Sequence, residues 1–302
     1  MFVTRRVPER VHEELDRLFE VDVHDAEQPL ERAELLRRAR GAAGLVTMLT
    51  DRVDKELLDA AGEGLRVVAN YAVGVDNVDL DAARRRGIAV TNTPDVLTGA
   101  TAEHTIALLL ALVRRVGEGD RLVRRRGAWV WAPTFMLGEG LEGKTLGIVG
   151  LGRIGREVAR LAEAFGLAVI STKTLPLEEL LVRADVVSLH CPLTPETHHL
   201  IGEKELRLMR REAYLVNTAR GPIVDERALA AALAERRLAG AALDVFEREP
   251  DVEEALLGLD NVVLTPHLGS ATRVAREAMG MLCVGALRAV LLEGRVPENA
   301  VS

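Results

Sequence analysis

The sequence predicts an α/β protein made of doubly wound parallel sheets. Short runs rich in Val, Ile and Leu alternate with amphipathic helical segments along most of the chain, and a glycine-rich turn joins one such run directly to a helix. Alternation of this kind favours parallel sheets with helices on both faces. A length of 302 residues leaves room for one to three domains, and two is the central expectation.

The first series of elements covers residues 2–90. We expect strands at residues 2–4, 21–23, 45–49, 67–69 and 88–90, and helices at residues 11–19, 33–40 and 55–61, from their apolar spacing. Thr93-Pro94 then breaks the pattern, because proline disfavours continuation of either element.

A second series follows a long helix at residues 99–112 and a polar, Arg-rich stretch that reaches Gly143. Its expected strands are residues 146–149, 168–170, 186–189, 214–217, 240–243 and 262–265, with helices at 154–165, 177–183 and 226–236. A final helix spans residues 273–292. It can end the second series or cross back to the first, and its length favours the crossing.

Composition and charge exclude several classes of protein. A net charge of −7 gives no reason to expect nucleic acid or an anionic membrane as a partner. Cys191 and Cys283 are far apart and form no metal or redox pair, which fits a reducing compartment. Residues 1–10 lack the apolar stretch of a signal peptide, and the apolar run 106–113 is too short to span a membrane. We therefore expect a soluble, cytoplasmic protein.

The glycine-rich turn predicts a dinucleotide site. A strand leads into Gly150-x-Gly152-x-x-Gly155, and an amphipathic helix follows. Gly150 permits the tight turn, Gly152 lets the backbone approach a pyrophosphate, and Gly155 lets helix and strand pack closely. The helix N-terminus offers N–H groups to an anion. A glycine turn without a ligand is the alternative, and the strand-before, helix-after context disfavours it.

The choice between NAD and NADP stays open. An acidic residue about twenty positions after the glycines holds the ribose hydroxyls in NAD sites. The corresponding stretch here is Ser171-Thr172-Lys173, which contains no acid. Lys173 can favour the extra phosphate of NADP, or it is an ordinary surface lysine.

Three segments that follow strands carry the candidate catalytic residues Arg220, Glu249 and His267. Arg220 can grip a carboxylate bidentately. Histidine is the residue type suited to acid/base work at physiological pH, so His267 is the candidate for that role, and Glu249 can accept from its second ring nitrogen. Each residue alone has an ordinary structural explanation. Their joint placement at strand ends beside a nucleotide fold favours reduction of a 2-oxo acid.

The whole chain resembles the D-isomer-specific 2-hydroxyacid dehydrogenases, and within them it is most similar to the glyoxylate/hydroxypyruvate reductases. The spacing of Arg220, Glu249 and His267 matches that family's pattern. The other motifs that carry the resemblance are Asn70-Tyr71-Ala72-Val73-Gly74-Val75-Asp76-Asn77, Thr91-Asn92-Thr93-Pro94, Gly150-Leu151-Gly152-Arg153-Ile154-Gly155, His190-Cys191-Pro192-Leu193-Thr194, Asn217-Thr218-Ala219-Arg220-Gly221, Leu243-Asp244-Val245-Phe246 and Pro266-His267-Leu268-Gly269-Ser270.

The resemblance implies NAD(P)H-dependent reduction of glyoxylate or hydroxypyruvate, with further roles for individual residues. Backbone amides at Val73 and Gly74 would hold the substrate carboxylate with Arg220, and Leu49 would line the pocket. Asp244 would hold the nicotinamide carboxamide. The remaining cofactor contacts implied are Gly150, Gly152, Arg153, Ile154, Gly155, Cys191, Pro192, Thr218 and Gly269. No metal is implied.

The resemblance also implies an architecture. Residues 1–97 and 271–302 would form a flavodoxin-like substrate-binding domain, residues 98–270 a Rossmann dinucleotide-binding domain, and the active site would lie in the cleft. A homodimer would form through the nucleotide-binding domain, with an arm at residues 129–140 reaching the partner.

One departure from the family pattern is a connection between residues 170 and 177 that is shorter by about ten residues. Either the family's loop is deleted, or the sequence omits a disordered loop; the second is favoured because losing that loop should weaken cofactor binding.

Two alternative functions remain. A phosphoglycerate-type dehydrogenase would need extra cations near the phosphate of its substrate, and a regulatory C-terminal domain often accompanies it. Formate oxidation, a further variant, is disfavoured because Glu249 stands where that subgroup has Gln. A dinucleotide-sensing, non-catalytic binding protein can retain Arg220, Glu249 and His267. It is disfavoured because no partner-binding tail is apparent.

Overall fold

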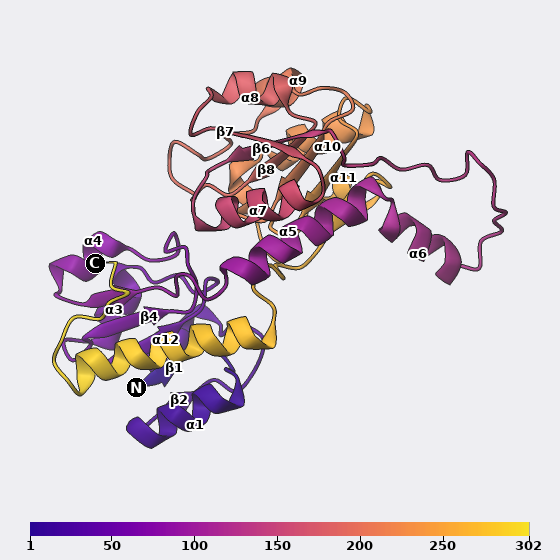
Figure 1. The fold of residues 1–302 in the computed structure, drawn as a ribbon. Helices are drawn as coiled ribbons and strands as arrows, with labels where there is room; N and C mark the ends of the chain where they lie inside the picture. The colour runs from indigo at the N-terminus through magenta and orange to yellow at the C-terminus, as the bar shows by residue number, and fades with distance from the viewer. Residues whose placement is uncertain (302) are drawn as a thin grey trace. The chain divides into compact units, whose positions relative to one another are not determined.

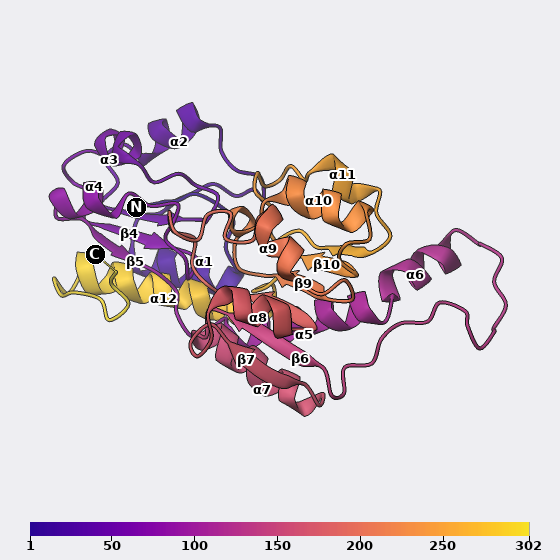
Figure 2. The same ribbon diagram turned by 90° about the horizontal axis from the view of Figure 1, so that it is seen from above.

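The computed structural model describes residues 1–301 and divides into two compact units. We call residues Met1–Leu97, together with the chain from Ala271 on, the terminal unit, and Thr98–Ser270 the central unit. Each unit is built on one parallel sheet with helices on both faces (Figures 1 and 2). The predicted fold class is therefore confirmed.

The sheet of the terminal unit has the strand order β2-β1-β3-β4-β5, which is the flavodoxin-like doubly wound order. Every residue of the strands β3 and β4 is buried, including the polar Thr47 and Asn70 at their ends, as expected for strands covered on both faces. The strands are β1 Phe2–Val3, β2 Asp22–Val23, β3 Gly44–Thr47, β4 Val67–Asn70 and β5 Ala89–Thr91.

Two helices, α1 (Glu9–Leu18) and α12 (Arg273–Leu291), cover one face of this sheet. Gly280 explains how closely they pack: a Cβ atom there would come within 2.4 Å of Val11 Cγ2 and 2.9 Å of the Tyr71 hydroxyl. The last helix of the chain thus packs on β3, β4 and β5 of the first series. The other face carries α2 Arg32–Ala39, α3 Lys55–Ala61 and α4 Leu80–Arg85 (Figure 2).

The central unit has the strand order β11-β10-β9-β8-β6-β7, with β6 at the point where the winding reverses. Its strands are β6 Thr145–Val149, β7 Ala168–Ser171, β8 Val186–Leu189, β9 Tyr214–Asn217, β10 Gly240–Leu243 and β11 Val262–Leu264. Helices α5 (Thr98–Val113) and α7 (Arg153–Ala164) pack together against one face. The other face carries α8 Leu177–Arg183, α9 Glu203–Leu208, α10 Glu226–Ala234 and α11 Glu254–Leu257.

The sheet of the central unit ends at β7. A full Rossmann order, 3-2-1-4-5-6, places one more strand beyond the second. Here only residues 172–176 separate β7 from α8, and β8 then pairs with β6. Within the described residues the third strand is therefore absent from the sheet, which agrees with the short connection noted in the sequence.

Helix α6 (Val116–Arg124) and the segment up to Gly140 extend away from the sheet of the central unit (Figure 1). No residue of α6 is buried. No helix was predicted here, because the stretch is polar and Gly117 and Gly119 disfavour a helix. This stretch contains the arm expected at residues 129–140, and we keep that name for those residues.

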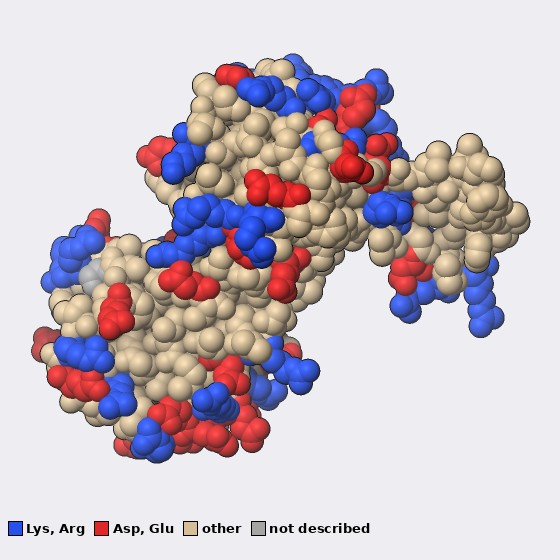
Figure 3. All heavy atoms as spheres, in the orientation of Figure 1, with Lys and Arg blue, Asp and Glu red and all other residues tan. Residues whose placement is uncertain are grey.

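Charged side chains of both signs are interspersed on the face shown in Figure 3. Many form pairs one helical turn apart, such as Arg17 with Glu14 and Arg160 with Glu157. These arginines thus lie on solvated helix faces, and such exposed pairs add little stability. Among residues 1–301, no helix has both the length and the apolar character needed to cross a membrane.

Candidate active site

Nearly all the predicted site residues lie at the carboxyl ends of strands in the central unit. The glycine turn follows β6, Cys191 and Pro192 follow β8, and Thr218 and Arg220 follow β9. Asp244 and Glu249 follow β10, and His267 and Gly269 follow β11. Since all six strands are parallel, these ends share one edge of the sheet, where ligands bind in open α/β folds.

The glycine turn has the geometry that each glycine was expected to provide. Gly150 has a φ of 93°, and a Cβ there would lie 2.5 Å from the backbone N of Cys191. A Cβ on Gly155 would lie 2.4 Å from the carbonyl oxygen of Gly150. A Cβ on Gly152 would meet no atom within 4 Å, so this glycine borders open space.

The residues present fit a dinucleotide. Gly152 is the N-cap of α7, and no side chain caps that helix, so its first turn presents N–H groups beside the open space at Gly152. These groups suit a pyrophosphate. Thr172, to which sequence reasoning gave no role, supports the turn, because its hydroxyl accepts from the Gly150 N–H at 3.1 Å.

Two of the expected cofactor contacts have clear structural environments. Burial raises the pKa of the Cys191 thiol, so Cys191 is uncharged near neutrality and fits a wall residue rather than a nucleophile. The Thr218 hydroxyl lies 2.8 Å from the Thr105 hydroxyl of α5, which ties the end of β9 to that helix.

Arg220 sits in a tightly built turn. The Asn217 side chain accepts from the Ala219 N–H and donates to the Arg220 carbonyl oxygen, at 3.0 and 2.8 Å. Gly221 follows, where a Cβ would lie within 2 Å of the Phe246 backbone. The backbone from which the Arg220 guanidinium extends is therefore fixed. Asn217 belongs to the Asn217–Gly221 motif quoted from the sequence, but its role in holding this turn is visible only in the structure.

Glu249 and His267 form the expected pair: Glu249 Oε2 and His267 Nδ1 are 2.8 Å apart. Burial alone would raise the pKa of Glu249, but the hydrogen bond and charge of His267, the Phe246 N–H and the Arg220 charge outweigh it and lower that pKa. An ionised carboxylate only accepts hydrogen bonds, so Nδ1 carries the proton. The other ring nitrogen, Nε2, is then the atom that exchanges a proton.

The His267 backbone adopts a left-handed conformation, with a φ of 56°. Its N–H donates to the Asp244 and Thr265 carbonyl oxygens at 2.8 and 3.1 Å, which holds this uncommon conformation in place. The backbone thereby fixes the imidazole opposite Glu249.

Asp244 is fully buried and organises the loop after β11. Its Oδ1 accepts from the Thr265 hydroxyl and the Leu268 N–H, and its Oδ2 accepts from the Gly269 N–H, all within 2.7 Å. His104 Nε2 of α5 lies 3.1 Å from Oδ1. His104 was not singled out in the sequence, because a lone histidine on a helix carries no motif.

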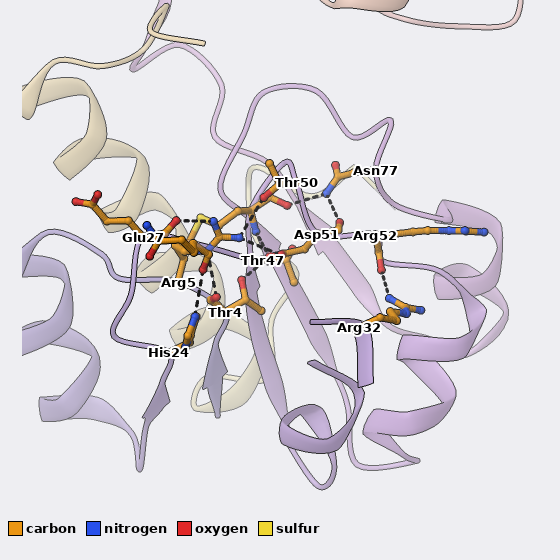
Figure 4. Close-up of polar contacts among 12 residues, drawn as sticks. Thr4, Arg5, His24, Glu27, Arg32, Thr47, Thr50, Asp51, Arg52 and Asn77 are labelled. Carbon is orange, nitrogen blue, oxygen red and sulfur yellow. Dashed lines mark hydrogen bonds and ion pairs between the residues drawn. The ribbon is translucent and has the colours of Figure 1, made fainter. Parts of the chain in front are cut away.

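Of the four predicted substrate-binding residues, Arg220 follows β9, and the other three lie in the terminal unit, in the loops that follow β3 and β4: Leu49, Val73 and Gly74. Polar side chains hold the first loop (Figure 4). Asp51 is buried and accepts from the Met48 N–H at 2.7 Å and from the Thr4 hydroxyl, and Arg5 lies 3.4 Å away.

Asparagine side chains connect the two loops. Asn77 Nδ2 donates to the carbonyl oxygens of Met48 and Asp51, at 3.1 and 3.0 Å. Asn70 and Asn77 also exchange hydrogen bonds through their amides, at 3.2 and 3.1 Å. The loop after β3 is therefore coupled to the loop after β4.

The carbonyl oxygens of Val73 and Gly74 are both bound by asparagine amides: Asn92 Nδ2 donates to Val73 O at 2.8 Å, and Asn70 Nδ2 donates to Gly74 O at 2.9 Å. Within residues 1–301 the N–H groups of Val73 and Gly74 have no protein acceptor. Such fixed amides suit an anion. The contacts of the Asn70 and Asn92 amides with these carbonyl oxygens were not predicted, because they depend on how neighbouring strands are paired.

A two-unit α/β fold with a dinucleotide turn and an Arg–Glu–His set at the strand ends defines an NAD(P)-dependent oxidoreductase of 2-hydroxy acids. The chain belongs to the D-isomer specific 2-hydroxyacid dehydrogenases: the model of that family's NAD-binding domain matches residues 106–269. The predicted family and enzyme class are confirmed.

Among curated proteins, the chain is 47% identical to the glyoxylate reductase of Thermococcus litoralis, covering 100% of this chain and 96% of that protein. It is 49% identical to the glyoxylate reductase of Pyrococcus furiosus, covering 100% and 95%. Both alignments span 321 positions against 302 residues here, so these relatives have at least 321 − 302 = 19 positions that this chain lacks.

Solved structures of other proteins are similar to this chain over its whole length. The TT0316 protein from Thermus thermophilus is 51% identical, with a TM-score of 0.94 and coverage of 100% of this chain and 99% of that one. An NADPH-dependent glyoxylate/hydroxypyruvate reductase from Sinorhizobium meliloti, in complex with NADP and malonate, is 36% identical, with a TM-score of 0.86 and coverage of 100% and 96%.

Proposed function

We propose that this protein reduces a small 2-oxo acid, glyoxylate or hydroxypyruvate, to the 2-hydroxy acid at the expense of NADH or NADPH. The observation that carries the proposal is the His267–Glu249 pair at 2.8 Å, on the same sheet edge as Arg220 and the dinucleotide turn. The glyoxylate reductase relatives, at 47–49% identity over the whole chain, support this substrate class.

The proposed reaction assigns a task to each polar group. The nicotinamide cofactor, when bound at the dinucleotide turn, would supply the hydride for the 2-carbon of the substrate. Arg220 pairs with the substrate carboxylate, as do the N–H groups of Val73 and Gly74. His267 donates the Nε2 proton to the oxygen that becomes the hydroxyl, and Glu249 stabilises the imidazolium before that transfer. The sum is one hydride and one proton added to the carbonyl group.

The residues proposed to hold the cofactor follow from the same sheet edge. Gly150, Gly152 and the first turn of α7 (Arg153, Ile154 and Gly155) take the pyrophosphate. Asp244 accepts from the nicotinamide carboxamide. Further contacts come from Cys191, Pro192, Thr218 and Gly269.

We further propose a homodimer formed through the nucleotide-binding domain, with the arm reaching the partner. The exposed apolar residues of the arm support this: Trp129, Val130 and Trp131 are 56, 79 and 78% exposed. The free cysteines Cys191 and Cys283 support a reducing, cytoplasmic location. The net charge of −7 gives no basis for binding nucleic acid.

The first test is loss of reduced-nicotinamide absorbance with purified protein, NADH or NADPH, and glyoxylate, hydroxypyruvate or pyruvate. We expect turnover, and in His267→Ala a fall of kcat by about 10²- to 10⁴-fold, typical of losing a general acid. Cofactor binding without turnover on any 2-oxo acid would contradict the reductase and favour a dinucleotide-sensing protein. Turnover confined to a phosphorylated hydroxy acid would favour the phosphoglycerate-type alternative.

A further inference from the structure

His104 occupies a place in the central unit that the proposed reaction leaves without a task. It lies on α5, and its Nε2 is 3.1 Å from Asp244 Oδ1 and 3.2 Å from the Thr265 hydroxyl. The side chain is 20% exposed, so most of it is enclosed, whereas Asp244 is fully buried. Helix α5 packs on β10 and β11, the strands that precede Asp244 and Thr265.

The neighbours of His104 fix which of its nitrogens carries the proton. The Asp244 carboxylate accepts hydrogen bonds and cannot donate one. The Thr265 hydroxyl gives its only proton to Asp244 Oδ1, at 2.6 Å, so towards His104 it also acts as an acceptor. Nε2 must therefore be protonated, and one N–H is shared between the carboxylate and the hydroxyl.

The two oxygens of Asp244 are unequally used. Oδ1 accepts from the Thr265 hydroxyl, the Leu268 N–H and His104 Nε2. Oδ2 accepts from the Gly269 N–H, its one donor among the described residues. Each carboxylate oxygen has about two lone-pair positions, so Oδ1, which is shared by three donors, is saturated, whereas Oδ2 with one donor is not. The three donors on Oδ1 thus fix the rotation of the carboxylate and leave an acceptor position on Oδ2.

We propose that His104 is a positioning residue for the nicotinamide: it holds the Asp244 carboxylate in the one rotation that aims Oδ2 at the carboxamide. This inference rests on the proposed function, because Asp244 is the residue assigned to the carboxamide. His104 acts through Asp244 and touches neither the substrate nor the reacting atoms. Its effect falls on the affinity for the nicotinamide half of the cofactor.

The chain allows a matched pair of substitutions. His104→Gln places an amide N–H near the position of Nε2, and His104→Met has a similar length but no donor. Glu103→Met is the control, because Glu103 is the exposed neighbour on the same helix. The readout is the dissociation constant for NADH from its fluorescence, and for ADP-ribose by displacement. ADP-ribose lacks the nicotinamide, so Asp244 has nothing to hold in it.

We expect His104→Met to weaken NADH binding on the order of tenfold, as for loss of a hydrogen bond to a charged group. We expect ADP-ribose affinity to stay unchanged, and His104→Gln to recover most of the NADH affinity. The proposal is overturned if His104→Met binds NADH as the wild type does, if NADH and ADP-ribose weaken together, or if Gln and Met behave alike.

The test separates this inference from the proposed function. If the wild type reduces glyoxylate and His104→Met binds NADH normally, the reductase stands and the role of His104 falls. If His104→Met selectively loses NADH affinity but the wild type reduces no 2-oxo acid, the role of His104 stands and the reductase falls. A wild type that binds neither NADH nor NADPH overturns both.

Discussion

At the scale of single residues, the charge of Glu249 is the feature most open to test. Its pKa is lowered, since the hydrogen bond and charge of His267 and smaller contributions from Phe246 N–H and Arg220 outweigh the effect of burial. Glu249→Gln keeps an acceptor beside Nδ1 but removes the charge. We expect kcat to fall by about 10- to 100-fold, as for a lost charged hydrogen bond, with NADH affinity unchanged.

The lowered pKa of Glu249 also fixes the sign of a pH effect. The carboxylate stabilises the fold fully above its unfolded pKa, and this contribution is lost as pH falls through the lowered folded value. Urea unfolding between neutral and acidic pH should show a shallower loss of stability in Glu249→Gln than in the wild type. Glu247→Gln is the control, because Glu247 bonds to His199 rather than to His267. Equal slopes in wild type and Glu249→Gln would contradict the assigned pKa shift.

At the scale of elements, the loops after β3 and β4 depend on each other through Asn77. Its amide holds the Met48 and Asp51 carbonyl oxygens and pairs with Asn70, which in turn holds Gly74 O. Asn77→Ala should raise the KM for glyoxylate about tenfold and cost about 1–3 kcal/mol in the free energy of unfolding, because buried carbonyls lose their donors. NADH affinity, which depends on the central unit, is the internal control. A normal KM in a destabilised variant would restrict Asn77 to a structural role.

The connection between β7 and α8 supports a prediction about cofactor choice. The Thr174 N–H donates to Ser171 O within a short turn, and no acidic residue stands between β7 and α8 to hold a ribose hydroxyl. We expect both NADH and NADPH to be used, with kcat/KM values within about tenfold of each other. Lys173→Glu should shift the preference towards NADH, because it replaces an exposed cation by an anion near the place of the 2′-phosphate. An unchanged ratio would make Lys173 an ordinary surface residue.

Some elements and site residues could be predicted from the sequence, and others could not. The shared sheet edge of Arg220, Glu249 and His267 was predictable, because each follows a strand and parallel strands bring their carboxyl ends to one edge. The helices α4, α6, α9 and α11 were not predicted: three are six residues or shorter, and α6 buries none of its residues. Roles for His104 and Asn77 could not be predicted, because their hydrogen-bond partners are set by tertiary packing rather than by spacing along the sequence.

At the scale of the whole molecule, the proposal that the arm contacts a second chain can be tested through the oligomeric state. Trp129, Val130 and Trp131 expose a large apolar surface on a segment that projects from its own sheet, so their burial requires another surface. We expect sedimentation to give twice the 32.8 kDa chain mass, and Trp129→Asp with Trp131→Asp to give single chains. Val296→Asp is the control, since Val296 is equally exposed, at 78%, but lies in the terminal unit. If dimers persist without the two tryptophans, the interface lies elsewhere; if they dissociate but retain turnover, each chain carries a complete active site.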